Sequence, residues 1–453
     1  MEGAVTLMEM LDAREARANR QRELLSEYHC PLVSFCLNIA GPVKNGPVLR
    51  RAFREGLARL EAALTASGVS PVHREELDRP TGCEALWAVP APGRLLKELC
   101  TRIEDGDDLG RLFDLDVLDT NGEKWGREQL GLPPRGCLVC GRAGKGCAAR
   151  RLHPLEEVEK RTGEILRAFF AGQDRELLSA QAVRALMYEV CTTPKPGLVD
   201  RYNNGSHRDM DVFTFLDSSA ALLPYFRRAV ELGQKTADQP PELTFVRLRE
   251  AGVRAEEDMF RATGGVNTHK GAIFSMGCLL GAAGRLWTPE GPCREPVRLL
   301  EECRAMAGAA VERFFSALTP GSAHTAGERL YLKTGLRGVR GEAADGFPSV
   351  LQTGLPALEA ALGQGCSLEQ AGVSVLLALM ARTVDTNLIA RGGQEGQRWA
   401  AQQAEVQLQS GPVPDLERVE QLNEAMVQRN LSPGGCADLL AITYFLHFLR
   451  GGG

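Results

Sequence analysis

The sequence has few aromatic residues, no long apolar run and no large excess of charge of either sign. Aromatic residues make up 6% of its 453 residues, and the net charge is only −5. The longest apolar run, around residues 373–381, is far shorter than the roughly 18 residues that a membrane-spanning helix needs. These features predict that the protein spans no membrane and binds no nucleic acid, and that any anion is bound by a local group of residues.

The N-terminus lacks the apolar core of a signal peptide. Residues 7–27 instead follow the pattern of a charged amphipathic helix. We therefore expect a cytoplasmic protein, in a compartment where thiols stay reduced. Most of the 13 cysteines are then expected to be small buried hydrophobic residues.

The composition is that of a globular protein, with 44% hydrophobic and 25% charged residues. At about 150 residues per domain, the length favours two or three domains. Helix and strand patterns alternate up to residue 171, which predicts an α+β domain over residues 1–171. The expected helices are residues 7–27 and 48–66, and the expected strands lie just after residue 30 and near residues 84–89 and 112–118.

From residue 172 onward helix patterns dominate, which predicts an all-α domain over residues 172–453. A helix followed by a polar joint, starting at Leu152, is expected to connect the two domains. Glycine-rich, charged loops separate the later helices, so the polar chemistry is expected between helices. The expected helices are residues 178–190, 212–232, 271–286, 296–318, 350–362 and 372–390.

The first polar segment of this part is TPKPGLVDRYNNGSHRDMD, which directly precedes an apolar helix pattern. An aspartate at that place can simply cap the helix. A cap does not need the basic, amide and imidazole groups beside it, so a site that holds metal and phosphate is the second interpretation. Its candidate residues are Lys195, Asn204, His207, Asp209 and Asp211.

Two glycine-rich segments also carry polar residues. TGGVNTHKG precedes an apolar helix pattern, so its glycines and the helix N-terminus could approach a phosphate; an ordinary turn is the alternative. TGLRGVRGEAADGFPSV offers arginines for phosphate and carboxylates for a metal or as a base; a solvated loop is the alternative. The candidate residues are Gly264, Gly265 and Lys270 in the first segment, and Arg337, Arg340, Glu342 and Asp345 in the second.

The segment VSVLLALMARTVDTNLIARGG has the pattern of one buried helix. Arg382 and Asp385 lie within one turn of each other and could form a structural ion pair. Alternatively, Asp385, Asn387 and Arg391 point into a polar cavity that the other three segments share. Together, the four segments suggest a site for Mg²⁺ and a triphosphate.

In the first domain, GRLFDLDV places Asp114 and Asp116 two residues apart on an expected strand, hence on the same face. Two carboxylates in this arrangement can hold Mg²⁺ against a phosphate group that is being transferred. An edge strand with a solvated acidic face is the structural alternative.

A cysteine-rich segment, CLVCGRAGKGC, follows that strand. Cys137, Cys140, Cys147 and the later His153 have ligand types that suit zinc. The later gaps are shorter than those of common zinc fingers. A basic, thiol-containing loop without metal is therefore the alternative.

Several of these motifs resemble two enzyme families. PLVSFCLNIAGPVK, GRLFDLDV and the stretch from RGCLVC to CAARRLH resemble the citrate lyase holo-acyl-carrier-protein synthase family (CitX). TPKPGLVDRYNNGSHRDMD, EEDMFRATGGVNTHKGAIFSMG, GLRGVRGEAADGFPSV and DTNLIARGG resemble triphosphoribosyl-dephospho-CoA synthase (CitG). The two resemblances together cover nearly the whole chain, as in a fusion of the families. They imply a nucleotidyltransferase-like fold for the first domain.

The resemblance implies two consecutive reactions. In the second domain, the 2′-hydroxyl of 3′-dephospho-CoA would attack C1′ of the ribose of ATP, which releases adenine and leaves the triphosphate intact. In the first domain, a serine of the citrate lyase acyl carrier protein (the gamma subunit) would attack the α-phosphorus of that product and release diphosphate. ATP and 3′-dephospho-CoA are thus the expected substrates, Mg²⁺ the expected cofactor and the carrier protein the expected partner.

The resemblance also suggests roles for the candidate residues. Breaking a ribose–adenine bond develops positive charge on the sugar, which a nearby carboxylate can stabilise. The residues expected to bind Mg²⁺ or to act as a base are Asp209, Asp211 and Asp385 in the second domain, and Asp114 and Asp116 are expected to bind Mg²⁺ in the first. The residues expected to bind phosphate are Lys195, Lys270, Arg337, Arg340, Lys44 and Arg111, and His207 or His269 is expected to assist the departure of adenine.

Two other functions stay open from the sequence alone. A Mg²⁺-dependent all-α hydrolase would cleave the N-glycosidic bond of a nucleotide or of ADP-ribose with water, without any need for dephospho-CoA. A scaffold for citrate lyase assembly would bind the carrier protein without modifying it, with the cysteine segment as a zinc-stabilised docking module.

Overall fold

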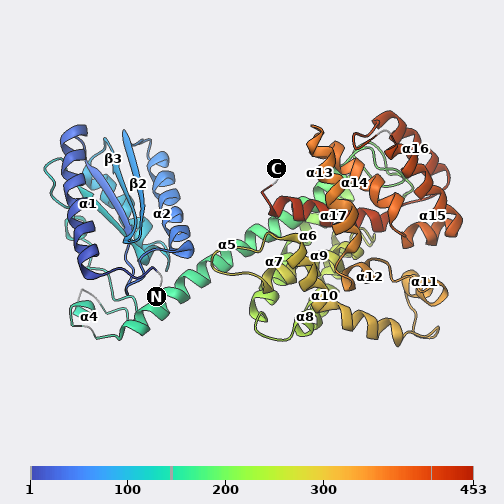
Figure 1. The fold of residues 1–453 in the computed structure, drawn as a ribbon, viewed down its shortest axis with the longest axis horizontal. Helices are drawn as coiled ribbons and strands as arrows, with labels where there is room; N and C mark the ends of the chain where they lie inside the picture. The colour runs from blue at the N-terminus through green and yellow to red at the C-terminus, as the bar shows by residue number, and fades with distance from the viewer. Residues whose placement is uncertain (1–2, 143–145, 151, 410, 452–453) are drawn as a thin grey trace. The chain divides into compact units, whose positions relative to one another are not determined.

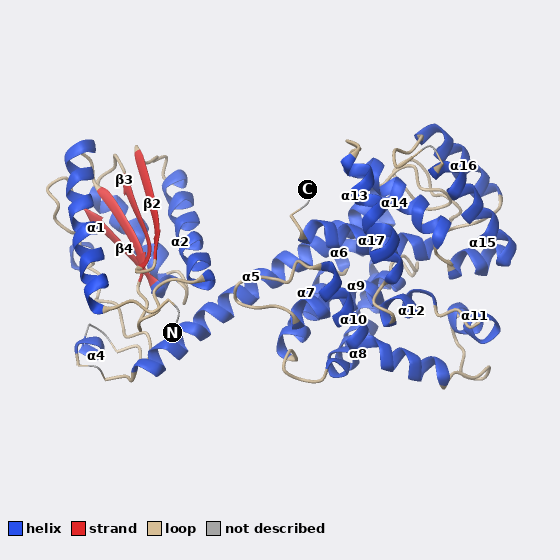
Figure 2. Ribbon diagram, viewed as in Figure 1, coloured by secondary structure: helices blue, strands red, loops and turns tan. Residues whose placement is uncertain are grey.

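The computed structural model describes residues 3–142, 146–150, 152–409 and 411–451. By its internal contacts, the chain divides into two compact units, Met1–Gly172 and Gln173–Gly453 (Figure 1). We name them the sheet unit and the helical unit. Every strand in the described residues belongs to the sheet unit, and the described part of the helical unit consists of helices and loops (Figure 2).

The sheet unit contains one antiparallel sheet with the strand order β2-β3-β1-β4. Strand β4 therefore lies at an edge. The predicted mixture of helices and strands is confirmed. The elements are α1 (Leu7–Tyr28), β1 (Leu32–Leu37), α2 (Pro47–Ala66), β2 (His73–Arg79), β3 (Gly82–Ala88), α3 (Gly93–Asp105), β4 (Phe113–Leu118) and α4 (Gly146–Ala149).

The two faces of this sheet differ in polarity. On one face, the Phe35 ring stacks on Phe53 of α2 with their centroids 4.8 Å apart, and the buried residues of β4 pack on α3. The other face carries polar residues that α1 contacts: Gln21 donates to Ser34 and Arg17 pairs with Glu84 at 3.1 Å. The α1 face thus carries polar residues on the central strands β1 and β3.

The sequence pattern missed β2 because this strand, HREELDR, lies at the other edge of the sheet. Alternate residues are exposed along it, so charged side chains stand where a central strand would carry apolar ones. Helix α3 was also missed, although its apolar residues are buried against the sheet.

Helix α5 (Leu155–Cys191) corrects the predicted helix–joint–helix arrangement. It continues through AFFAGQDRELL without a break, because all these residues except one glycine are compatible with a helix interior. Its residues up to Gly172 belong to the sheet unit, and those from Gln173 belong to the helical unit.

The helical unit buries one large apolar core. After α5, its helices are α6 (Val212–Ala221), α7 (Leu223–Lys235), α8 (Pro241–Ala262), α9 (Lys270–Arg285), α10 (Pro296–Ser316), α11 (Ala326–Thr334), α12 (Gly338–Ala344), α13 (Leu355–Gly363), α14 (Leu368–Arg382), α15 (Thr386–Leu408), α16 (Leu416–Gln428) and α17 (Gly434–Leu449). Helices α9, α14 and α17 are apolar on nearly all sides and lie within that core.

Three predictions for this unit were wrong. The expected helix over residues 212–232 is split at Leu222, since Pro224 in the first turn of α7 cannot donate a backbone hydrogen bond. The expected helix over residues 372–390 ends at Arg382, and Asp385 caps the next helix. The third polar segment is not only a loop, because α12 forms within it.

No single helix of the described residues is both long and apolar enough to cross a membrane. The pair α14 and α15, bent by 56°, passes that test together, by length and composition only.

Candidate functional site

One polar cavity of about 520 Å³ in the helical unit collects residues from all four polar segments of the sequence. Its lining also includes residues of α8 and α11, which directly precede two of these segments, and of α17, which follows all four along the chain. The structure therefore brings together most of the predicted residues. Those that line the cavity are Lys195, His207, Asp209, His269, Lys270, Arg337, Arg340, Asn387 and Arg391.

Buried Asp200 holds the first polar segment in its conformation. One of its oxygens accepts hydrogen bonds from the backbone N–H groups of Tyr202 and Asn203, and the other accepts from Lys195 N–H at 3.1 Å. Gly197 has φ 73°, and a Cβ there would lie 2.2 Å from the Leu431 carbonyl oxygen. The segment is thus folded tightly against the turn before α17.

His207 and Arg391 lie next to each other in the cavity wall. His207 Nε2 is 2.9 Å from Ser432 Oγ, and its Nδ1 is 3.4 Å from Arg391 Nη2. Burial and the Arg391 charge lower the pKa of His207. The imidazole is therefore neutral at neutral pH.

His269 is almost fully buried, and its ring meets Phe215 edge to face. Thr268 donates to Ser218 Oγ, which lies 2.7 Å from His269 Nδ1. If Ser218 donates in turn, Nδ1 accepts and the proton is on Nε2, which has no partner within the described structure. Burial lowers the pKa of His269 to about 3, so this side chain is a neutral donor.

Four of the predicted phosphate ligands are already paired with carboxylates. In each pair the carboxylate neutralises the positive charge of the lysine or arginine. A phosphate must therefore share this cation with the carboxylate or displace the carboxylate. Burial raises the pKa of Glu189 although its partner Lys195 opposes this shift. The pairs are Lys195–Glu189 at 2.5 Å, Lys270–Glu256 at 2.7 Å, Arg337–Asp345 at 2.5 Å and Arg340–Glu328 at 3.3 Å.

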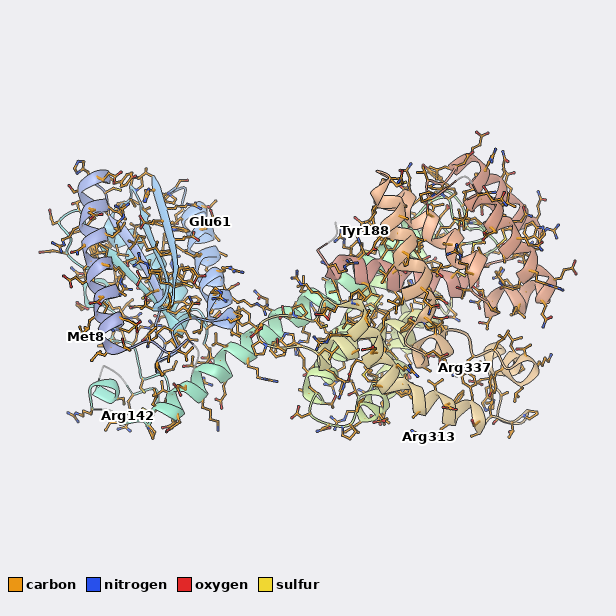
Figure 3. All side chains as sticks on the ribbon, in the orientation of Figure 1. Met8, Glu61, Arg142, Tyr188, Arg313 and Arg337 are labelled. Atoms are coloured by element: carbon orange, nitrogen blue, oxygen red, sulfur yellow. The ribbon has the colours of Figure 1, made fainter. Side chains whose placement is uncertain are left out.

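Arg391 differs from these four cations. Its guanidinium donates to the Ser206 carbonyl and to Asn430 Oδ1, which are both neutral. No carboxylate pairs with it among the residues that the structure describes. Arg391 thus offers the cavity an uncompensated positive charge. By contrast, Arg337, which Figure 3 labels, lies at the start of α12 and pairs with Asp345.

Two predicted acidic residues are helix caps. Asp211 Oδ1 accepts from the Thr214 backbone N–H at 2.9 Å and from its hydroxyl at 2.7 Å, which forms a capping box for α6. Asp385 is buried and accepts from the N–H groups of Asn387, Leu388 and Cys436. Arg382 is exposed. The described residues therefore show no Arg382–Asp385 ion pair.

The remaining predicted residues of this part lie outside the cavity lining. Glu342 accepts two hydrogen bonds from Ser349. Gly264 and Gly265 form an exposed turn with φ of 65° and 95°, which glycine adopts without strain. Asn204 is exposed, and its carbonyl accepts from the His207 N–H.

Asp438 of α17 is a cavity residue that the sequence analysis missed. Its carboxylate has no hydrogen-bond or ion-pair partner in the described parts of the chain. Burial raises its pKa well above the ordinary value, and the negative charges of Glu189 and Asp385 add to this. A Cβ at Gly271 would lie 1.9 Å from Asp438 Oδ2. The available signal was one aspartate inside the apolar run GGCADLLAITYFLHFL.

In the sheet unit, Asp114 and Asp116 lie on the α1 face of β4, as their spacing predicted. They alternate with the buried residues of the strand. The thiol of Cys36 on β1 lies 3.8 Å from Asp114 Oδ2, and Lys124 pairs with Asp116 at 2.5 Å. Both carboxylates are half-buried. This is the same-face pair that a metal–phosphate site requires.

The two predicted basic residues lie at one end of the sheet. Leu37, the last residue of β1, pairs with Phe113, the first residue of β4. Arg111 precedes Phe113 by two residues and therefore lies at this end of the sheet. Gly82, the first residue of β3, lies at this same end, and a Cβ there would be 3.5 Å from the Lys44 carbonyl oxygen. Arg111 donates to the Gly136 carbonyl at 2.7 Å, and Lys44 donates to the Ile39 carbonyl.

The cysteine segment forms a compact cluster. The ligand atoms of Cys137, Cys140, Cys147 and His153 all lie within 4.8 Å of one another. His153 Nδ1 is 3.0 Å from a Glu157 carboxylate oxygen, and its buried Nε2 has no partner among the described atoms. This arrangement brings together three sulfur atoms and one nitrogen that can bind one metal ion.

Two family models match the chain, and together they cover nearly all of it. The CitG model, described as ATP:dephospho-CoA triphosphoribosyl transferase, matches residues 175–453. The CitX model, described as apo-citrate lyase phosphoribosyl-dephospho-CoA transferase, matches residues 5–169.

Three relatives extend this similarity. The chain is 36% identical to Protein CitXG of Haemophilus influenzae over 99% of this chain and 97% of that protein. It is 34% identical to Protein CitXG of Leuconostoc mesenteroides subsp. cremoris over 99% and 98% of the two chains. It is also 45% identical to the 2-(5''-triphosphoribosyl)-3'-dephosphocoenzyme-A synthase of Pectobacterium atrosepticum over 60% of this chain and 88% of that protein.

Proposed function

The chain belongs to the CitXG family, with a CitX part and a CitG part in one polypeptide, and we propose that each compact unit carries one of two transfer reactions. It is a bifunctional transferase that makes and attaches the citrate lyase prosthetic group. In the helical unit, ATP and 3′-dephospho-CoA give the triphosphoribosyl derivative and adenine. In the sheet unit, this product reacts with a serine of the carrier protein and releases diphosphate.

The first assignment rests on the polar cavity. Among the described residues, Asp438 there has no cationic partner and Arg391 has no carboxylate partner. We assign Arg391 to the triphosphate, with Lys195 and Lys270 beside it. Asp438 accepts the proton of the attacking 2′-hydroxyl, because a raised pKa suits a general base near neutral pH. His269 Nε2 donates a hydrogen bond to the departing base.

The cavity also fits Mg²⁺. This ion keeps several waters and binds through one or two carboxylates together with substrate phosphates. The exposed Asp209 lines the cavity and has no hydrogen-bond partner in the described chain, so its carboxylate would hold the ion while Asp438 remains the base. Bound Mg²⁺ would neutralise phosphate charge. Asp211 keeps its capping role, and we assign no metal to Glu342 or Asp345, which lie outside this cavity.

In the sheet unit, we assign Asp114 and Asp116 to Mg²⁺ on the phosphates of the product. The chemistry of the donor set fits, since both carboxylates are half-buried and share a face. Lys44 and Arg111 lie at the sheet end nearest Asp114 and bind phosphate oxygens. The nucleotidyltransferase-like class of this fold is part of the same proposal.

We further assign Zn²⁺ to Cys137, Cys140, Cys147 and His153. Tetrahedral zinc with Zn–S distances of about 2.3 Å sets sulfur atoms roughly 3.8 Å apart, and the Cys140 and Cys147 sulfurs are 3.6 Å apart. Glu157 orients His153 as outer carboxylates orient zinc-binding histidines. The metal would also hold in place the residues just before Cys137. One of them, Arg135, donates to the Phe113 and Gly110 carbonyls.

The partner is the citrate lyase acyl carrier protein, which we assign to the gamma subunit. We also propose a cytoplasmic location, where the free cysteines of the chain stay reduced. Both assignments are part of the proposal.

The decisive experiment incubates the full chain with ATP and Mg²⁺, with or without dephospho-CoA, and follows free adenine by chromatography. We expect adenine release only when dephospho-CoA is present. Release with water alone would instead support a hydrolase. Mass spectrometry of the carrier protein then reports the second reaction, and a carrier that binds without gaining mass would support a scaffold.

The zinc assignment is tested by elemental analysis of the purified chain. We expect one zinc per chain, lost in Cys147→Ser and retained in the control Cys366→Ser, which changes a cysteine of the helical unit. Equal zinc content in the two variants, or none in the wild type, would contradict the assignment.

A further inference from the structure

A second, smaller pocket lies beside the polar cavity in the helical unit. Its volume is about 210 Å³, and Glu256, Phe274 and Arg340 line both spaces. The pocket and the cavity therefore adjoin. Pockets that hold a whole small ligand usually measure about 300–1,000 Å³. This pocket suits one fragment of a ligand whose remainder lies in the cavity.

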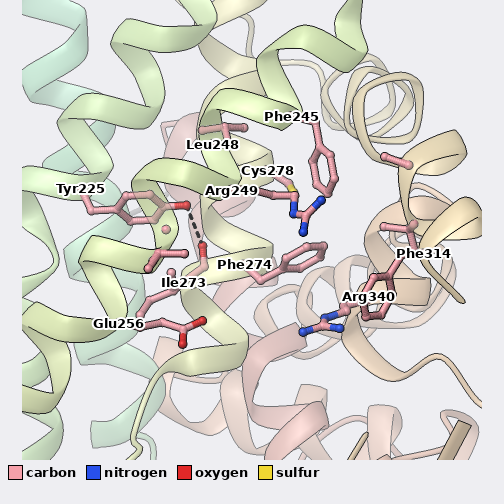
Figure 4. A pocket seen from close by; sticks show the side chains of 14 residues that line it. Tyr225, Phe245, Leu248, Arg249, Glu256, Ile273, Phe274, Cys278, Phe314 and Arg340 are labelled. Carbon is pink, nitrogen blue, oxygen red and sulfur yellow. Dashed lines mark hydrogen bonds between the residues drawn. The ribbon is translucent and has the colours of Figure 1, made fainter. Parts of the chain in front are cut away.

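Flat side chains surround this pocket. Figure 4 shows the rings of Phe245, Phe274 and Phe314 with the guanidinium groups of Arg249 and Arg340. Arg340 lies 5.0 Å from the centroid of Phe314, and the rings of Phe245 and Phe274 meet edge to face at 6.0 Å. Aromatic and guanidinium planes are the surfaces on which nucleobases stack.

The polar groups of the pocket are also informative. Tyr225 donates its hydroxyl to the Ile273 carbonyl at 3.1 Å and is thereby occupied within the protein. Glu256 lies where the pocket meets the cavity, and it pairs with Lys270 at 2.7 Å. A carboxylate accepts hydrogen bonds from an exocyclic amine. Stacking planes with an acceptor at the junction match an aminopurine better than a flexible apolar chain.

We propose that this pocket binds the adenine base of ATP, the leaving group of the first reaction, while the triphosphate lies in the polar cavity. The proposal rests on the proposed function of the helical unit. It places the bond between the base and C1′ near the junction of the two spaces. That bond breaks with its electron pair going to the base, the dephospho-CoA oxygen bonds to C1′, and the proton lost by the 2′-hydroxyl ends on adenine.

The test fills the pocket. Gly252 of α8 lines it, and a Cβ there would meet only Tyr225 Oη at 3.7 Å and Ile273 Cγ2 at 3.8 Å. Gly252→Leu therefore adds a side chain without a backbone clash and favours the helix. We expect KM for ATP and the inhibition constant of free adenine to rise at least about tenfold, with KM for dephospho-CoA unchanged, since losing one base stack corresponds to roughly that factor.

The matched control is Gly363→Leu, at an exposed helical glycine with nothing within 4 Å, which we expect to leave all three constants unchanged. Phe314→Leu removes one flat ring while keeping an apolar side chain, and it should shift the same two constants less. Equilibrium dialysis of free adenine gives a readout independent of turnover.

Dephospho-CoA also carries an adenine, so the two sources must be separated. A rise in KM for dephospho-CoA alone, or unchanged adenine binding in Gly252→Leu, would overturn the proposal while the proposed function stands. A wild-type chain that releases no adenine with both substrates would instead overturn the proposed function.

Discussion

The two acidic groups of the sheet unit come from a single strand, whereas the polar cavity of the helical unit draws its residues from many separate helices and loops. On β4, the pleat alone sets Asp114 and Asp116 on one face. In the cavity, Lys195 and Asp438 come from distant parts of the chain, and both line one space because α17 lies in the core. A site with local origin tolerates changes elsewhere, while a site with distributed origin depends on the packing of the whole unit.

The difference also appears in the electrostatics. The acidic pair of the sheet unit is half-buried, and Asp116 pairs with Lys124. In the helical unit, carboxylates pair with most of the cavity cations. Among the described residues that line the cavity, Asp209, Asp438 and Arg391 have no partner of opposite charge. Selective variants can therefore separate the two units.

The largest effect is expected from Asp438→Asn. Loss of a general base lowers kcat for adenine release by about 10²- to 10⁴-fold, with transfer of supplied product to the carrier unchanged. In the wild type, activity should fall as the pH drops through the raised pKa of Asp438, because a protonated carboxyl cannot accept a proton. Stopped chromatographic assays across pH measure both effects.

The control for this variant is Asp217→Asn, at an exposed aspartate of α6. It should retain wild-type rates in both assays. A pH profile of Asp438→Asn that keeps the wild-type acidic limb would show that another group is the base.

The reciprocal effect is expected from Asp114→Asn and Asp116→Asn. Each should slow carrier modification by about 100-fold, since one electrostatic contact to the reacting phosphates is lost, while adenine release stays unchanged. Intact-mass spectrometry of the carrier follows the time course. Asp119→Asn, beyond the end of β4, is the control. Loss of both activities would mean that the units do not function separately.

A smaller effect is expected from Arg391→Gln. Removing the unpaired charge should raise KM for ATP by about tenfold, the value of one hydrogen bond to a charged group, and leave kcat nearly unchanged. Initial rates at varied ATP measure this. Arg398→Gln, exposed on the same helix, should behave as wild type. An equal rise in both variants would point to the overall charge of α15.

The smallest effect on activity is expected from Asp211→Ala. Its carboxylate caps α6, so the change should lower the free energy of unfolding by about 1 kcal/mol and leave adenine release within about twofold of wild type. Denaturant unfolding and the adenine assay test this together. Asp211→Ser, which can still cap, should restore most of the stability. A large loss of activity in both variants would return Asp211 to the metal site.

Much of the secondary structure was predictable because it depends on local periodicity. The strand of Asp114 and the start of the helix that Asp211 caps follow directly from neighbouring residues. The predicted helix through Asp385 failed because its carboxylate satisfies backbone N–H groups of α15 and α17, including that of Cys436 far along the chain. Local patterns contain no information about such a partner.

By itself, the sequence determined the α+β and helical character of the two parts, the same-face pair on β4, the composition of the cysteine cluster and the resemblance to two transferase families. These depend on nearest-neighbour spacing and on residue types. Only the tertiary structure decided which polar groups share the cavity, that Asp385 caps α15 and binds the Cys436 N–H, and that Asp438 lies against Gly271 without a partner among the described residues. The physical reason is that burial and pairing of a charge depend on residues distant in sequence, which only the packed core brings together.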